Sequence, residues 1–167
     1  MIGIYAAAKI ILLASMCAFH GPMPQKNPAP QKKQMVVAII EPSGDAGRIN
    51  KSTLRGALEE FVTKSKEYRV VDRARADQVF GELNLQRTSA MIEPNTAKAI
   101  GKQLGADFVC ISELIKEEGY TNINISLINV ETGVVSASGS RLVEGDDPKT
   151  IANSTKEIAS AMLGVKK

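Results

Sequence analysis

Residues 101–143 read GKQLGADFVCISELIKEEGYTNINISLINVETGVVSASGSRLV, and this stretch decides the fold. It predicts the end of a helix, an apolar strand and a long β-hairpin in immediate succession. Gly105 suits the left-handed position that commonly ends a helix. The strand that follows, residues 107–115, carries apolar side chains on both faces: Phe108, Cys110 and Leu114 on one, Val109 and Ile111 on the other. A strand that is apolar on both faces belongs in the middle of a sheet.

The hairpin that follows can be given a register from its pattern of side chains. A three-residue loop over 131–133, with Gly133 in the left-handed position, would place Val130 opposite Val134. The core-facing pairs are then Leu127 with Ala137 and Ile125 with Gly139, and the polar pairs are Asn124 with Ser140 and Ser126 with Ser138. A two-residue loop would instead mix the polar and apolar faces, so the three-residue register is preferred.

The remaining elements follow from apolar spacing and capping residues on either side of this stretch. In chain order we expect a buried strand over 35–41, a loop over 42–47, a helix over 51–67 capped by Asn50 or Ser52, a short strand over 68–71, a helix over 73–86 capped by Asp72, a short helix from Pro94, and a closing helix from Pro148 capped by Asp146 or Asp147. The order is β-α-β-α-α-β-β-β-α. It predicts an α/β fold with a single mixed sheet packed by helices, with a parallel β-α-β start and an antiparallel C-terminal hairpin.

The first 34 residues differ in composition from the rest. Residues 1–21 combine Lys9 with a short apolar run, which is typical of a secretory signal peptide and too short for a membrane span. Cys17 is a candidate for lipidation, but the bulky Met16 before it departs from the lipoprotein pattern, so ordinary cleavage near Cys17 or Ala18 stays open, as does a cytosolic N-terminus. Export to the periplasm or outer membrane is expected, with membrane contact only through such a lipid.

Residues 22–34 contain four prolines among polar and basic residues, a composition that predicts a semi-rigid linker. Thirteen residues at ~3.1 Å each would reach about 40 Å when extended. The folded domain is expected over 35–167, which is one domain by length.

Composition and motifs argue against several classes of function. Beyond Gly21 there are 20 basic and 18 acidic residues without a basic stripe, so nucleic acid is not an expected partner. The only histidine, His20, lies in the predicted signal peptide, and neither cysteine has neighbours at metal-ligand spacing. Residues 44–52 end in Lys-Ser and resemble a phosphate loop superficially, but Asp45 and Asn50 stand where that loop needs glycine. No enzyme activity and no cofactor are expected, and nucleotide binding is kept as a minor alternative.

Four motifs in order give a family resemblance over residues 35–163. LGADFVCISELI and ISLINVETGVVSAS look like the strand and hairpin of the CsgG, LpoB and TolB-amino-terminal group of bacterial envelope proteins, and VAIIEPSGDAG and YRVVDRARADQVFGELNLQ are similar to its earlier segments. Members of this group differ in task, so the resemblance specifies a fold better than a function.

The resemblance implies a non-catalytic, protein-binding module of the Gram-negative cell envelope. Its partners would be envelope proteins, among them a peptidoglycan synthase of the penicillin-binding type or outer-membrane assembly proteins. A ring-forming accessory subunit of a curli-like secretion apparatus is the alternative, with a homo-oligomer as its mark. The connections at 117–119 and 131–133 are too short to hold membrane-spanning hairpins, whose strands need about 9–11 residues each.

Two groups of residues are candidates for binding a partner. The first is a polar ladder of small side chains on the hairpin: Asn124, Ser126, Ser138 and Ser140. Its alternative is an ordinary solvated sheet face. The second is the loop after the first strand, where Ser43, Asp45 and Arg48 are candidates because loops beside strand ends often carry function. Its alternative is a simple connector.

Overall fold

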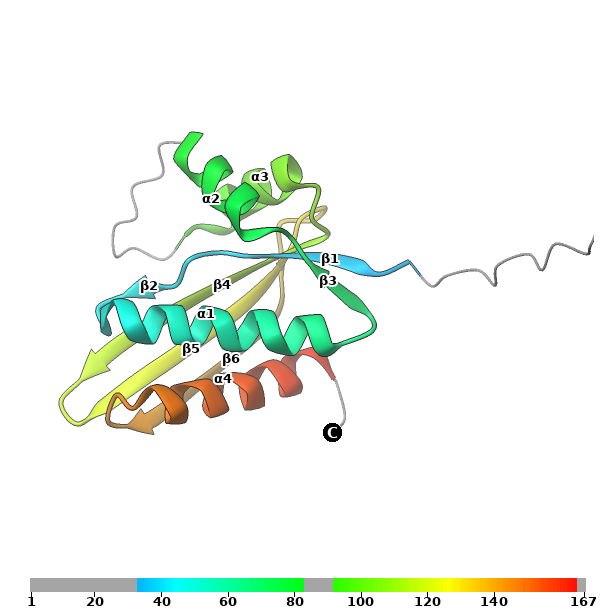
Figure 1. Ribbon diagram of the computed structural model, residues 1–167. Helices are drawn as coiled ribbons and strands as arrows, with labels where there is room; N and C mark the ends of the chain where they lie inside the picture. Colours follow the sequence, from blue (N-terminus) through cyan, green and yellow to red (C-terminus); the bar gives the residue numbers. More distant parts are fainter. Residues whose placement is uncertain (1–32, 83–91, 165–167) are drawn as a thin grey trace, which may run out of the picture. The chain divides into compact units, whose positions relative to one another are not determined.

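The computed structural model describes residues 33–82 and 92–164. Within them the chain forms six strands and four helices (Figure 1). In chain order these are β1 (Met35–Ile39), β2 (Ser43–Gly44), α1 (Gly47–Lys64), β3 (Tyr68–Val70), α2 (Arg73–Glu82), α3 (Pro94–Leu104), β4 (Phe108–Glu117), β5 (Tyr120–Asn129), β6 (Val135–Glu144) and α4 (Pro148–Leu163). The predicted signal peptide, with Cys17, and nearly all of the predicted linker lie outside the described residues.

The strands form one mixed sheet in the order β3-β1-β4-β5-β6, and the two-residue β2 pairs with β4 beyond the end of β1. Strands β1, β2, β3 and β4 are parallel where they pair, and β4, β5 and β6 form an antiparallel meander. The predicted α/β class and element order are confirmed, with β2 as a small addition inside the expected loop. Strand β4 lies in the centre, as its two apolar faces predict.

Helices cover both faces of the sheet, and each face has its own apolar core (Figure 1). On one face α1 and α4 pack against Cys110, Leu114 and the odd-numbered residues of β5. On the other face α2 and α3 pack against Val109 and Ile111 of β4 and the β5 end near Ile128. Helices α2 and α3 contact β1, β4 and that end of β5, so none of the described helices covers the rest of the β5–β6 surface on their side.

Most helix ends follow the sequence signals. The Asp72 carboxylate accepts the N–H of Arg75 (3.2 Å), and the Asp147 carboxylate accepts that of Thr150 (2.9 Å), as N-caps do. Gly105 ends α3 at a positive φ of 64°, which a glycine adopts without strain. The predicted cap of α1 is wrong. The helix begins at Gly47 without a side-chain cap, and the Asn50 amide instead donates to the Asp146 carbonyl (3.1 Å).

The β5–β6 register agrees with the prediction over most of its length and differs near the turn. Asn124 faces Ser140 and Ser126 faces Ser138, but a bulge beyond Leu127 places Ile128 opposite Val135. The expected pairing of Val130 with Val134 is therefore wrong. The Val130 N–H donates to the Asp107 carbonyl (3.0 Å) and the side chain is buried against α3, so core packing removes this residue from the ladder.

Candidate functional site

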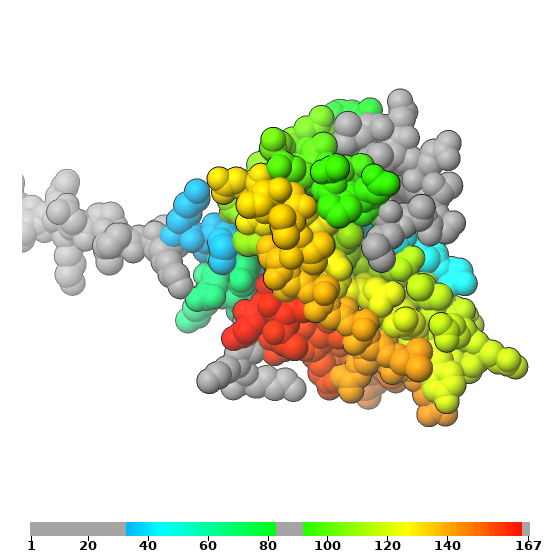
Figure 2. Space-filling view, turned by 180° about the vertical axis from the view of Figure 1, so that it is seen from behind, coloured from blue at the N-terminus to red at the C-terminus, as the bar shows by residue number. Residues whose placement is uncertain are grey.

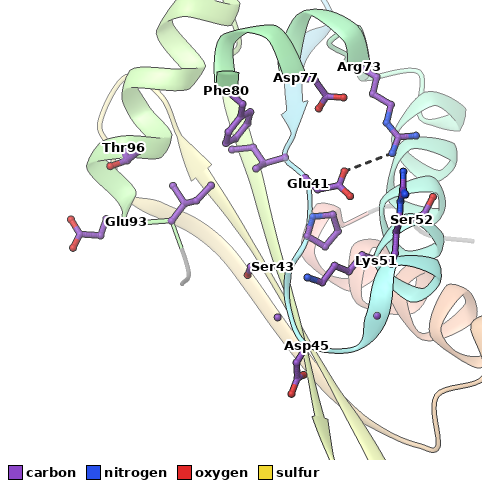
Figure 3. A pocket seen from close by; sticks show the side chains of 16 residues that line it. Glu41, Ser43, Asp45, Lys51, Ser52, Arg73, Asp77, Phe80, Glu93 and Thr96 are labelled. Carbon is purple, nitrogen blue, oxygen red and sulfur yellow. Dashed lines mark ion pairs between the residues drawn. The ribbon is translucent and has the colours of Figure 1, made fainter. Parts of the chain in front are cut away.

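A groove of about 1040 Å³ lies beside the carboxyl end of β1 (Figure 3). Its lining comes from the β1–β2 connection, the first turns of α1, the inner side of α2 and the start of α3. The predicted loop residues Ser43, Asp45 and Arg48 all belong to this lining. The structure thus brings the second candidate group together at one surface.

Two of these three residues have bonds that hold the loop against β4. The Ser43 hydroxyl donates to the Ser112 carbonyl (3.3 Å), and the Asp45 carboxylate accepts the backbone N–H of Lys116 (2.7 Å). Gly44 lies between them with φ 97°, and a Cβ there would stand 1.9 Å from the Leu114 carbonyl oxygen. Only glycine allows this approach. Ser43 and Asp45 therefore have structural roles, which leaves the exposed Arg48 as the candidate of the group without such a role.

An arginine that the sequence analysis missed lies under the groove. Arg55 is 1% exposed and forms ion pairs with Glu41 (2.7 Å), Glu59 (3.0 Å) and Asp77 (3.2 Å). Arg73 adds a longer contact to Glu41 (3.7 Å; Figure 3). These residues come from the β1–β2 connection, α1 and α2, so the cluster joins elements from both helical layers.

The charges of this cluster largely cancel. Burial acts to lower the pKa of Arg55, but its hydrogen bonds to Glu41 and Asp77 and the charges of both carboxylates outweigh burial and raise that pKa. A buried arginine paired in this way stays charged and serves as a fixed counter-ion. Glu41 and Asp77 are thus paired, and the lining with Arg55 beneath it holds as many basic as acidic side chains, so the groove gives no net charge that would select a partner.

The polar ladder lies on the side of β5 and β6 that is free of helices in the described part of the chain, and Figure 2 shows this face of the molecule. Ser138 and Ser140 are exposed, and Asn124 and Ser126 are half-buried between neighbouring strands. The structure brings all four predicted ladder residues together, in the predicted register.

Exposed apolar side chains flank this ladder at both ends. Tyr120 and Leu142 lie near one end, 47% and 56% exposed, and Val135 lies at the other, 43% exposed, while the neighbouring Val134, 62% exposed, precedes β6. Among the described residues only one other large hydrophobic, Ile49, is comparably exposed. We refer to the ladder with Tyr120, Val135 and Leu142 as the open sheet face. The sequence pattern missed its apolar part, because exposure depends on where the helices end.

The described residues offer little for catalysis. The Cys110 thiol is completely buried, and burial raises its pKa to about 12, so it is a core side chain and not a nucleophile. Within residues 33–82 and 92–164, no group of three His, Cys, Asp or Glu side chains could hold a metal ion. None of the described helices is long and apolar enough to cross a membrane.

Several solved structures share this fold. The LpoB C-terminal domain from Salmonella enterica is 18% identical, with 66% of this chain and 83% of that chain aligned and a TM-score of 0.55. The LpoB C-terminal domain from Escherichia coli is 17% identical over 71% and 88%, with a TM-score of 0.54. The lipoprotein GNA1162 from Neisseria meningitidis is 13% identical over 66% and 80%, with a TM-score of 0.53. At these identities the likeness shows the fold alone.

The sequence comparisons place the chain more narrowly. Comparison with curated proteins finds no match. The model of the family described as peptidoglycan-synthase activator LpoB matches residues 22–141. The LpoB part of the expected resemblance is thereby confirmed, whereas its CsgG and TolB parts stay predictions. Because the match spans well over half of the sequence, this chain belongs to the peptidoglycan-synthase activator LpoB family.

Proposed function

We propose that this chain is a non-catalytic activator of a peptidoglycan synthase and that it binds the synthase through the open sheet face. The proposed function rests on the family match over residues 22–141, because the family is one of peptidoglycan-synthase activators. An activator of this kind works through protein contact, so it needs an exposed surface and no active site. The comparisons give no support to the curli-like alternative.

The composition of the open sheet face supports its role as the contact surface. Soluble proteins rarely leave several large apolar side chains exposed together unless the patch binds something. Here three of them flank small polar side chains that can form hydrogen bonds across an interface. By contrast, the groove beside β1 has balanced charges, and Ser43 and Asp45 are already engaged. The open sheet face is therefore the stronger of the two surfaces.

The N-terminal residues complete the proposal. Residues 1–21 would direct export in a Gram-negative bacterium, and residues 22–34 would connect the domain to a membrane if Cys17 is lipidated. The domain would then meet its synthase in the periplasm.

A reconstituted synthase assay tests the function and the surface together. The purified mature chain should raise the glycan-polymerising or crosslinking rate of a purified synthase from the same organism. The double variant Asn124→Lys, Ser138→Lys places two charges on the open sheet face and should abolish both stimulation and binding. The matched control Thr63→Lys, Asn153→Lys adds the same charges to exposed positions of α1 and α4 and should behave as the unchanged chain.

Two results would contradict the proposal in different ways. If the unchanged chain stimulates none of the organism's synthases, the proposed function is wrong. If the synthase is stimulated equally by the folded ladder variant, the function stands and the contact surface lies elsewhere, with the groove around Arg48 as the next candidate.

A further inference from the structure

Strand β6 is the outermost strand of the sheet, and its free edge is unusually unprotected. It is ten residues long, and no strand among the described residues pairs with its outer side. Proteins commonly protect such an edge with charged side chains, especially lysine, with proline or a bulge, with a very short strand or with a covering segment. The sequence VSASGSRLVE contains neither lysine nor proline, its two charged residues are Arg141 and Glu144, and its bulge lies at the turn end. The Arg141 guanidinium is directed to Glu157 of α4.

A second groove runs beside this edge, between β6 and α4. It is lined by Ser138–Arg141 of the strand and by Glu157, Ile158, Ala161 and Met162 of the helix. At Gly139 the two elements are in close contact, since a Cβ there would stand 2.6 Å from Cγ2 of Ile158. The helix side of the groove is mainly apolar, because Ile158, Ala161 and Met162 line it. The charged residue on that side, Glu157, is paired with Arg141.

These features define the chemistry of an occupant. The alternating N–H and C=O groups of a free strand edge are satisfied only by another extended main chain. Side chains of such a segment that point toward α4 would meet Ile158, Ala161 and Met162, so small apolar residues suit those positions. Side chains that point the other way would continue the open sheet face beside Ser140 and Leu142, both of which project from β6.

We propose that an extended segment of the synthase adds to the sheet along the outer edge of β6, in the groove between β6 and α4. This inference rests on the proposed function and specifies how that partner is held. The edge and the open sheet face share β6, so one partner can contact both surfaces without a gap. Main-chain pairing would supply affinity and the apolar groove would select the segment, as in other cases of strand addition.

Hydrogen exchange in the complex tests strand pairing directly. Amides within residues 135–144 should exchange more slowly in the complex of the mature chain with the purified synthase, because outward-pointing N–H groups gain acceptors. The variant Ala161→Arg fills the groove from an exposed helix position and should weaken binding about tenfold or more. Its control, Asn153→Arg, adds the same side chain at an exposed position of α4 away from the groove and should leave affinity unchanged.

The outcomes separate this inference from the proposed function. Binding and stimulation with unchanged exchange in β6 and no effect of Ala161→Arg would overturn strand addition and leave the function standing. Absence of any binding by the unchanged chain would overturn both. Light scattering of the chain alone gives a third arm: a dimer whose β6 amides are already protected would show that a second copy, and not the synthase, occupies the edge.

Discussion

At the scale of single residues, Arg55 is the side chain that links most elements. It lies on α1 and reaches Glu41 after β1 and Asp77 on α2, while Glu59 one turn further along α1 completes the cluster. Helices α1 and α2 belong to opposite cores, so this ion cluster ties the two helical layers together beside the sheet. Its carboxylates are 28–39% exposed, so the buried charge is the arginine alone.

Replacing Arg55 by methionine should therefore be destabilising. The variant keeps an unbranched apolar stem but removes the guanidinium, and so leaves three carboxylates near one another without their shared cation. Removal of one member of a buried ion pair costs ~3–5 kcal/mol when the charge left behind is buried, and we expect less here, about 1–3 kcal/mol, because the three carboxylates left behind are in contact with water. Urea unfolding would measure the loss, with Arg75→Met at an exposed position of α2 as the control. A loss no larger than that of the control would contradict this role.

Glu60 gives a prediction about pH. Hydrogen bonds from Lys156 of α4 and Lys64 of α1, with the charges of both lysines, lower the pKa of Glu60 from 4.5 to about 2. A carboxylate whose pKa is lower in the folded state stabilises that state above its unfolded pKa. This contribution is complete above pH 4.5 and is lost as the pH falls toward 2.

The variant Glu60→Gln should remove that part of the pH dependence. Its free energy of unfolding should fall less steeply than that of the unchanged chain between pH 4.5 and 2, measured by urea unfolding at fixed ionic strength. Glu118→Gln, in the exposed β4–β5 turn, is the control. Identical slopes for the Glu60 variant and the unchanged chain would show that the α1–α4 ion pairs are absent in solution.

At the scale of elements, β4 and the helix termini could be predicted because their signals are local. Two apolar faces identified β4 as central, and Asp72, Gly105 and Asp147 marked helix ends that the structure contains. The start of α1 could not be predicted in this way, because it has no capping side chain. The ladder register followed from alternation, whereas the bulge did not, since it depends on burial of Val130 against α3.

The burial of Arg55 could not be predicted either. The apolar stripe of α1 indicates which face meets the sheet, but the partners Glu41 and Asp77 lie 14 and 22 residues away along the chain. Only Glu59, four residues on, is visible as a local pair. The same reason explains the missed apolar part of the open sheet face, which exists because α2 and α3 stop short of β6.

The close contact between α3 and the end of β5 predicts that a substitution of Gly101 lowers stability. A Cβ on Gly101 would stand 2.3 Å from Cγ2 of Val130 and 2.8 Å from Cγ2 of Val109, and branched valines have little freedom to move. Gly101→Ala should lower the free energy of unfolding by roughly 1–3 kcal/mol, because overpacking outweighs the helix preference of alanine. A Cβ on Gly56 of α1 would meet open space, so Gly56→Ala should raise the free energy of unfolding by about 0.5–1 kcal/mol. Thermal or urea unfolding of both variants would check these opposite signs, and equal signs would contradict the close α3 packing.

At the scale of the whole molecule, the question is how far the domain can reach from its membrane. For an exported chain the sequence leaves two fates open for the N-terminus, lipidation at Cys17 or cleavage that frees the domain. A lipid anchor would limit the domain to about 40 Å from the membrane through the predicted linker. A freed domain would diffuse to any synthase, and linker length would have no effect on it.

Shortening the linker therefore separates the two fates. Deletion of residues 25–31 would reduce the reach by about 22 Å at ~3.1 Å per residue. For an anchored chain we expect loss of synthase activation in cells, measured as incorporation of a labelled cell-wall precursor, while the purified domain keeps its full effect on the purified synthase. A variant with the same seven residues in another order preserves length and should retain activation. If the deletion leaves incorporation unchanged, the domain is not tethered through Cys17, and a second variant, Cys17→Ser, should then also be without effect.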